Sequence, residues 1–208
     1  MFLSGACPKR RRINKNAQRA RLTGGFCYYK DMHRKPVLFL DFDHTLFDTE
    51  QFYAWLGEDR FEKILGITSG KVDPPNFASY LYADTLPFLN TARKTHRLVL
   101  LTYSVNQMLQ RRKVRDSGIV PLLDDVIISH RNKGLEAKEY ITRIGDPGWE
   151  HGFVDDAPQN ISDMKTENPD IRTFRIERRI LPPDAFHGAL CEADVVVKDL
   201  YELAKCIF

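Results

Sequence analysis

Residues 37–49 read V-L-F-L-D-F-D-H-T-L-F-D-T. The first four, Val37 to Leu40, form a continuous apolar run, as in a parallel strand that helices cover on both faces. Asp41 and Asp43 follow directly, and residues two apart on an extended backbone point the same way. Open α/β sheets bind their ligands beyond the carboxyl ends of the strands. The stretch therefore predicts a strand that delivers two carboxylates to a binding edge.

Two carboxylates this close repel each other unless a cation lies between them or one of them is protonated. Mg²⁺ is a hard ion that prefers oxygen ligands, and a phosphate ester is its natural companion. The residues D-F-D-H-T at 41–45 resemble the first motif, D-x-D-x-T, of the haloacid dehalogenase (HAD) superfamily. Later segments of the chain resemble the other motifs of that family, in the family's order.

A second apolar run, Leu98 to Leu101, predicts another buried strand, which ends at Thr102, Tyr103 and Ser104. This segment is similar to the second HAD motif, a hydrophobic strand ending in Thr or Ser. A hydroxyl and free backbone N–H groups at a strand-to-helix turn are suited to a phosphoryl oxygen. The resemblance implies that Thr102 and Tyr103 contribute to phosphate binding.

The third HAD motif is a lysine at the start of a helix, whose ammonium neutralises the nucleophile and the phosphate. Residues 131–144 have helical apolar spacing, and both Lys133 and Lys138 match the motif. We favour Lys133, because it stands in a K-G pair immediately before the helix and 22 residues before Asp155. Lys138, within the helix, remains the alternative.

The fourth motif of the family is an acidic pair that completes the metal site. Here the short strand predicted over residues 152–154 ends in Asp155 and Asp156. With Asp41 and the backbone carbonyl of Asp43, the resemblance implies that Asp156 holds the metal, and that Asp155 either shares this role or holds a metal-bound water.

The rest of the chain continues an alternation of strands and helices. A strand is expected near residues 171–176, another near 193–197, and a helix after that. Residues from about 48 to 84 are rich in aromatic side chains and interrupt the alternation, at the place where HAD proteins carry a cap over the active site. The resemblance, which covers residues 36–208, implies an α/β fold: a three-layer Rossmann-like core with a parallel sheet and a short helical cap inserted after the first motif.

The first 31 residues differ from the remainder in charge. They carry eight Lys and Arg residues against a single Asp, so the formal charge of +3 divides into +7 for residues 1–31 and −4 for residues 32–208. We expect a basic, disordered tail on a single domain of residues 32–208. The tail is interpreted either as a nucleic-acid contact through residues 9–21, or as a solvated extension upstream of a natural start at Met32.

Composition narrows the class of protein further. The four cysteines show no metal-binding spacing, and no apolar run approaches the roughly 18 residues needed to cross a bilayer. The N-terminus lacks the apolar segment of a secretory signal. We therefore expect a cytoplasmic protein without a membrane partner.

Together these features predict a Mg²⁺-dependent phosphatase that hydrolyses a small phosphate monoester through an aspartyl-phosphate. The resemblance makes Asp41 the nucleophile, Asp43 the acid and base, and Lys133 the neutralising cation. Alternatives are a nucleic-acid-associated protein that uses the basic tail and a HAD phosphotransferase. Dehalogenation is disfavoured by Asp43, because a halide leaving group needs no acid. His44 differs from the commoner small or apolar residues there and is either a substrate contact or an ordinary loop residue.

Overall fold

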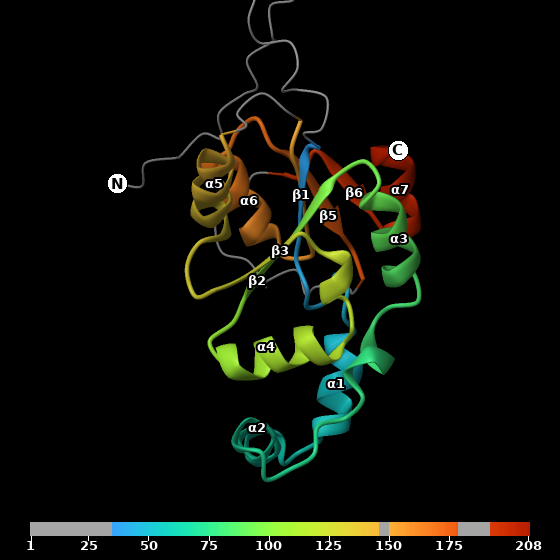
Figure 1. Cartoon of the computed structure of the whole chain (residues 1–208), viewed down its shortest axis with the longest axis vertical. Helices are drawn as coiled ribbons and strands as arrows, with labels where there is room; N and C mark the ends of the chain where they lie inside the picture. The colour runs from blue at the N-terminus through green and yellow to red at the C-terminus, as the bar shows by residue number, and fades with distance from the viewer. Residues whose placement is uncertain (1–34, 146–149, 179–191) are drawn as a thin grey trace, which may run out of the picture.

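The computed structural model describes residues 35–145, 150–178 and 192–208, which build one six-stranded sheet (Figure 1). All strand pairs in it are parallel, and the strand order is β3-β2-β1-β4-β5-β6. The strands are β1 (Val37–Leu40), β2 (Arg97–Tyr103), β3 (Asp125–Ser129), β4 (Gly152–Asp155), β5 (Arg172–Ile176) and β6 (Val195–Val197). The central position of β1 confirms that the apolar run before Asp41 is a strand buried on both faces.

Helices cover both faces of the sheet, which confirms the expected three-layer α/β fold (Figure 1). Alternation along β1 directs Phe39 to one core, under α5 (Lys133–Ile144) and α6 (Pro158–Glu167). Leu38 and Leu40 point to the other core, under α3 (Thr85–Ala92) and α7 (Leu200–Ile207). Each core is lined by side chains from several strands, so the sheet holds the ends of β1, β2 and β4 in fixed register.

A helical insertion follows β1 and extends from the core (Figure 1). It consists of α1 (Thr49–Leu56), α2 (Arg60–Ser69) and the 3₁₀ turn η1 (Phe77–Tyr80). Its buried aromatic rings pack on Phe47, with centroid distances of 5.9 Å to Phe52, 6.5 Å to Phe77 and 5.6 Å to Tyr80. The short helical insertion expected after the first motif is thus present, and its aromatic residues mainly anchor it to the core.

Helix α4 (Gln107–Asp116) begins after Asn106, which caps it by accepting a hydrogen bond from the Leu109 N–H at 3.0 Å. It ends before Gly118, which has a φ of +81°. The sequence did not predict the short 3₁₀ turn η2 (Val120–Leu122) that follows.

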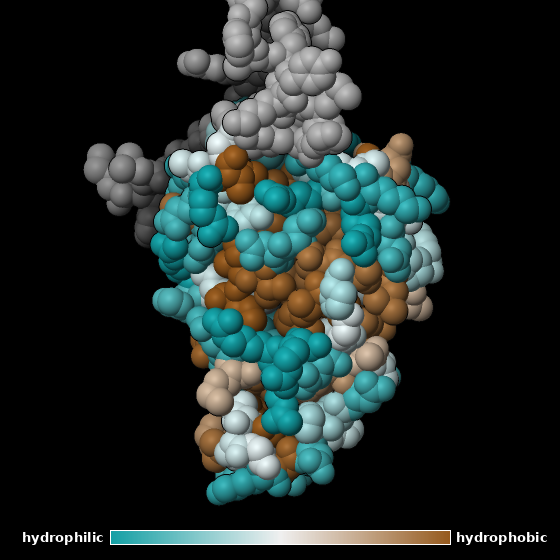
Figure 2. All heavy atoms as spheres, viewed as in Figure 1, coloured by the Kyte–Doolittle hydropathy of each residue, from teal (hydrophilic) through white to brown (hydrophobic). Residues whose placement is uncertain are grey.

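Strand β3 forms an edge of the sheet, and its residues 125–128 are partly exposed, whereas all four residues of β1 are buried. Figure 2 shows hydrophobic side chains gathered in the middle of this face, between the hydrophilic surfaces of α4 and α5.

At the other side of the molecule, α7 returns from the carboxyl edge of the sheet to the amino edge. There the ring of Phe208 lies 6.3 Å from that of Phe88.

No helix within the described residues is long and apolar enough to cross a membrane. The expected tail, residues 1–31, and its proposed nucleic-acid contact at 9–21 lie outside the described residues.

Candidate active site

The loop after β1 places Asp41 at the carboxyl edge of the sheet. The N–H of Asp41 donates to the Val154 carbonyl at 2.9 Å, and its side chain is buried. The chain then turns tightly, with the Phe42 carbonyl accepting from the N–H groups of both Leu46 and Phe47 at 2.9 Å. His44 has a φ of 58°, a left-handed conformation that this turn imposes. The turn holds the residues of the first motif against the strand ends.

Lys133 comes to Asp41 from α5, across 92 residues of sequence. Its Nζ lies 2.5 Å from Asp41 Oδ1 and 2.7 Å from Asp155 Oδ2, and the side chain is buried. Asn132 caps the helix at this point by accepting from the Leu135 N–H at 3.1 Å. Lys138, the alternative, is exposed and lies 3.3 Å from Glu167. Of the two lysines, therefore, Lys133 contacts the acidic residues of the site.

Three buried carboxylates meet at this edge, from Asp41, Asp155 and Asp156. One ligand oxygen of each lies within 4.8 Å of those of the other two. Asp155 is fixed by Asn160, whose Nδ2 donates to both of its oxygens at 3.0 Å. Within the described residues, this group forms at the ends of β1 and β4, two neighbouring strands.

Two groups of this cluster, Asp41 and Lys133, have perturbed pKa values. Burial raises the pKa of Asp41 well above its ordinary value, and the nearby carboxylates add to this effect although Lys133 opposes it. Burial by itself would lower the pKa of Lys133, but Asp155 and Asp41 raise it overall, so the ammonium stays charged. Among the described residues, Lys133 pairs with two of the three carboxylates, Asp41 and Asp155. A divalent cation that accepts oxygen ligands fits this donor set.

Asp43 is held by a different group of side chains. One of its oxygens accepts from Thr49 Oγ1 at 2.6 Å and pairs with Lys113 Nζ, while the other accepts from Gln110 Nε2 at 2.6 Å. Burial would raise the pKa of Asp43, but Lys113 and these hydrogen bonds lower it overall. Its carboxylate is therefore ionised and pairs with side chains of α4. The part of Asp43 that was expected to bind a metal is its backbone carbonyl.

Sequence reasoning missed Lys113 and Gln110. Helix α4 is polar along most of its length, yet both side chains are buried. The available signal was their spacing, since residues three apart lie on the same face of a helix and here follow a predicted phosphate-binding segment.

The remaining predicted residues occupy different environments. Thr102 is buried, and its Oγ1 accepts from Gln110 Nε2 at 3.0 Å, so its hydroxyl belongs to the same network as Asp43. Tyr103 is 49% exposed, and its side chain is not part of this network. His44 is buried, with Nε2 3.9 Å from Glu50. The carbonyl of Thr45 accepts from Arg178 at 3.2 Å.

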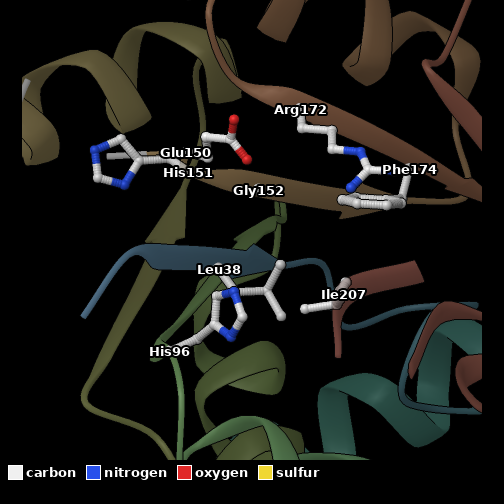
Figure 3. A pocket seen from close by; sticks show the side chains of 8 residues that line it. All are labelled: Leu38, His96, Glu150, His151, Gly152, Arg172, Phe174 and Ile207. Atoms are coloured by element: carbon white, nitrogen blue, oxygen red, sulfur yellow. The ribbon is translucent and has the colours of Figure 1, made fainter. Parts of the chain in front are cut away.

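A separate pocket lies at the opposite, amino edge of the sheet (Figure 3). It is lined by Leu38, His96, Glu150, His151, Gly152, Arg172, Phe174 and Ile207. In Figure 3 the polar side chains point in different directions, and His151 accepts from the Val37 N–H at 3.0 Å. None of the predicted site residues lines this pocket, so the candidate active site is the carboxyl edge.

The fold is that of the HAD superfamily, as the sequence motifs indicated. A HAD-like hydrolase from Burkholderia xenovorans is 19% identical, with a TM-score of 0.67 and coverage of 84% of this chain and 97% of that one. A HAD phosphatase from Thermococcus onnurineus is 20% identical, with a TM-score of 0.58 and coverage of 83% and 97%.

Other similar structures differ in the chemistry that their names give. A HAD hydrolase from Bacillus subtilis, bound to magnesium, is 16% identical, with a TM-score of 0.57 and coverage of 84% and 99%. An L-2-haloacid dehalogenase is also among the matches, at 17% identity. No protein-family model and no curated protein matches the sequence.

Proposed function

We propose that this protein is a Mg²⁺-dependent phosphatase that hydrolyses a phosphate monoester through an aspartyl-phosphate on Asp41. The observation that carries the proposal is the buried contact of Lys133 with both Asp41 and Asp155, beside Asp156. A carboxylate nucleophile, a fixed cation and a further acidic pair at one sheet edge are the groups that phosphoryl transfer to an aspartate requires.

In the proposed first step, an oxygen of Asp41 attacks phosphorus in line with the leaving oxygen. The Lys133 ammonium is already within hydrogen-bonding distance of Asp41, so it neutralises charge without moving far. The Thr102 hydroxyl is proposed to bind a phosphoryl oxygen, together with Lys133. Tyr103 belongs to the proposed phosphate site only because it follows Thr102 at the end of β2.

Asp43, whose carboxylate is ionised in this structure, is proposed to take up a proton once the substrate is bound and to pass it to the leaving oxygen as the P–O bond breaks. It then takes a proton from the water that hydrolyses the aspartyl-phosphate. The proposed ligands of Mg²⁺ are Asp41, the Asp43 backbone carbonyl, Asp156 and Asp155, the last directly or through water. Bound there, the ion would offset the negative charge of the phosphoryl group.

Two other reactions fit the fold. Phosphate transfer to an acceptor other than water would use the same residues, and dehalogenation is the activity named for some similar structures. The presence of Asp43 favours a leaving group that needs a proton, which an alkoxide does and a halide does not. We further propose a small-molecule ester as substrate and the cytoplasm as the location.

A panel of phosphate monoesters, assayed with Mg²⁺ and with EDTA, tests the proposal. Wild-type protein is expected to release phosphate from p-nitrophenyl phosphate only with Mg²⁺. Asp41→Asn should abolish this release, because an amide does not readily attack phosphorus. Circular dichroism of both proteins controls for folding. Comparable turnover in a folded Asp41→Asn variant would overturn the assignment of the nucleophile.

Metal binding has a test that needs no turnover. If Mg²⁺ binds the native carboxylate cluster, millimolar Mg²⁺ should raise the Tm of the wild type, because a ligand of the native state stabilises it. Asp156→Asn removes one charged ligand and should reduce the shift, whereas Asp163→Asn, a change on the surface of α6, should retain it. Equal shifts in all three proteins would place the ion elsewhere.

A further inference from the structure

Lys113 is a buried lysine in the last turn of α4, with 4% of its surface exposed. Lysine is almost never this buried unless its ammonium is paired. Its Nζ lies over the rings of three phenylalanines, at 4.7 Å from the centroid of Phe47, 5.4 Å from Phe42 and 5.5 Å from Phe52. These rings belong to the first-motif loop and to α1. An aromatic enclosure of this kind limits the places that the ammonium can occupy.

Within this enclosure, Lys113 makes an ion pair with Asp43 and donates to Gln110 Oε1 at 3.2 Å. Gln110 in turn donates to the second oxygen of Asp43 at 2.6 Å. Together with Thr49, these side chains contact both oxygens of the carboxylate. A short aspartate side chain bound through both oxygens is held in a single rotamer.

The position in which Asp43 is held lies next to the predicted phosphate site. The same Nε2 atom of Gln110 contacts Asp43 Oδ2 and Thr102 Oγ1, at 2.6 and 3.0 Å. The carboxylate of the proposed acid and a hydroxyl of the proposed phosphate site thus share one donor. Any movement of α4 would shift both groups together.

We propose that Lys113, assisted by Gln110, is a positioning residue that orients the Asp43 carboxylate toward the leaving oxygen of the substrate. This inference rests on the proposed phosphatase function. Lys113 acts through Asp43 rather than on the phosphoryl group, which Lys133 serves from α5. Of the lysines in the described part of the chain, the two buried ones thus pair with the two aspartates of the first motif.

The test compares esters with good and poor leaving groups. Lys113→Met keeps the length of the side chain and removes its charge, so it frees Asp43 from its partner. General acid catalysis contributes about 10²–10⁴-fold, and we expect kcat/KM for an alkyl phosphate to fall about 30-fold or more. For p-nitrophenyl phosphate, whose leaving group needs no proton, kcat/KM should change less than about threefold. The value of kcat/KM reports only the steps up to aspartyl-phosphate formation, so the rate of the later hydrolysis does not affect this comparison.

Two further variants make the result interpretable. Arg115→Met alters an exposed cation of the same helix and should leave both esters unaffected. Gln110→Met removes only the bonds from Gln110, and should reproduce the selective loss at smaller size if Lys113→Met does not fold. Equal losses for both esters would mean that Lys113 only supports the fold, and no loss for either would mean that Asp43 needs no positioning. Both results overturn the proposal.

A thermal-unfolding cycle of Lys113→Met, Asp43→Asn and the double variant tests the contact without turnover. The Tm loss of the double variant should be smaller than the sum of the single losses. Additive losses would refute the contact itself. If the wild type hydrolyses neither ester, the proposed function fails and the role of Lys113 with it, while a non-additive cycle would still establish the ion pair as structural.

Discussion

Lys133 is the residue on which the assembly of the site depends. It follows Asn132 at the first turn of α5, so its side chain starts at the carboxyl edge of the sheet and reaches both Asp41 and Asp155. A lysine one turn further along, such as Lys138, projects from the surface of the helix instead. The position within the helix, more than the residue type, decides which lysine can neutralise the nucleophile.

We predict that Lys133→Ala lowers phosphatase turnover about 100-fold or more, a loss of roughly 3 kcal/mol of transition-state stabilisation. Lys138→Ala should stay within about threefold of the wild type, because its side chain contacts only Glu167. Steady-state kinetics on p-nitrophenyl phosphate at saturating Mg²⁺ measures both. The reverse ranking would assign the third motif to Lys138.

The sequence predicted the residues that follow strands directly. Asp41 and Asp155 each come at the end of a short apolar run, and parallel strands bring such ends to one edge. Lys113 was not predictable in this way, since it is buried against the first-motif loop rather than against the sheet. Periodicity reports which face of a helix packs on a core, and it does not report that a polar face is covered by an insertion.

At the scale of elements, α5 and α6 approach each other closely at Gly134. A Cβ atom placed there would lie 2.6 Å from the carbonyl oxygen of Asp163, a backbone atom that cannot rotate away. The Gly134 carbonyl also accepts from Asn168 Nδ2 at 2.7 Å. The K-G pair that marked Lys133 in the sequence is therefore also a packing requirement between two helices.

Gly134→Ala should destabilise the protein by about 1–3 kcal/mol through overpacking. This sign is opposite to the gain of about 1 kcal/mol that alanine gives at an open helical position. Urea unfolding measures the difference, and Thr142→Ala, at an exposed position of the same helix, provides the control that should be neutral or slightly stabilising. A stabilised Gly134→Ala protein would show that the two helices can separate without cost.

The link between β5 and β6 includes a carboxylate with a perturbed pKa. Asp194 accepts from the N–H and the hydroxyl of Thr173, at 2.9 and 3.0 Å, and pairs with Lys165 at 2.9 Å. Burial would raise the pKa of Asp194, but these contacts lower it overall. A lowered pKa means that the contacts stabilise the fold when the carboxylate is ionised.

This stabilisation is complete above the unfolded pKa of about 3.9 and is lost as the pH falls through the lower, folded value. We therefore expect Asp194→Asn to lower the Tm at pH 7 and at pH 5, and the gap to the wild type to narrow below about pH 4. Thermal unfolding of both proteins across this range is the measurement. A gap that stays constant down to acid pH would mean that the charge of Asp194 contributes nothing.

For whole elements, the apolar runs predicted the order of strands and helices well, because each run is buried in the sheet. Their ends were less predictable. Strand β2 extends from Arg97 to Tyr103, beyond its apolar centre, since backbone pairing with β3 continues to Ser129. The fold of the insertion was also beyond the sequence pattern, because its aromatic residues pack both on Phe47 and on one another across separate segments.

At the scale of the molecule, one buried ion pair joins four distant segments. Arg178, after β5, pairs with Asp84 at 2.7 Å and donates to the carbonyl of Thr45 in the first-motif loop. Asp84 also accepts from the N–H of Leu200, at the start of α7, at 2.9 Å. The end of the insertion, the first-motif loop, β5 and α7 are thus fixed to one another.

Asp84→Ala should destabilise the protein by about 3–5 kcal/mol, because it leaves the buried Arg178 guanidinium without its carboxylate. Adding Arg178→Met should cost less than Arg178→Met alone costs in the wild type, since the two side chains interact. Urea unfolding of the four proteins gives the coupling directly. Strict additivity would show that the pair does not join these segments energetically.

Because α7 returns to the amino edge of the sheet, Phe208 offers a point for attaching the protein to a surface. Phe208 is held at this edge against Phe88 and His96, whereas Asp41 follows β1 and Lys133 begins α5 at the carboxyl edge. Figure 1 marks the C-terminus at the end of the molecule opposite α1 and α2. A biotin or an affinity tag joined after Phe208 would therefore orient immobilised molecules on a sensor chip with the carboxylate cluster toward the flowing solution. Attachment through a cysteine introduced at the exposed position 61 of α2 (Phe61→Cys) would instead turn the inserted helices toward the support.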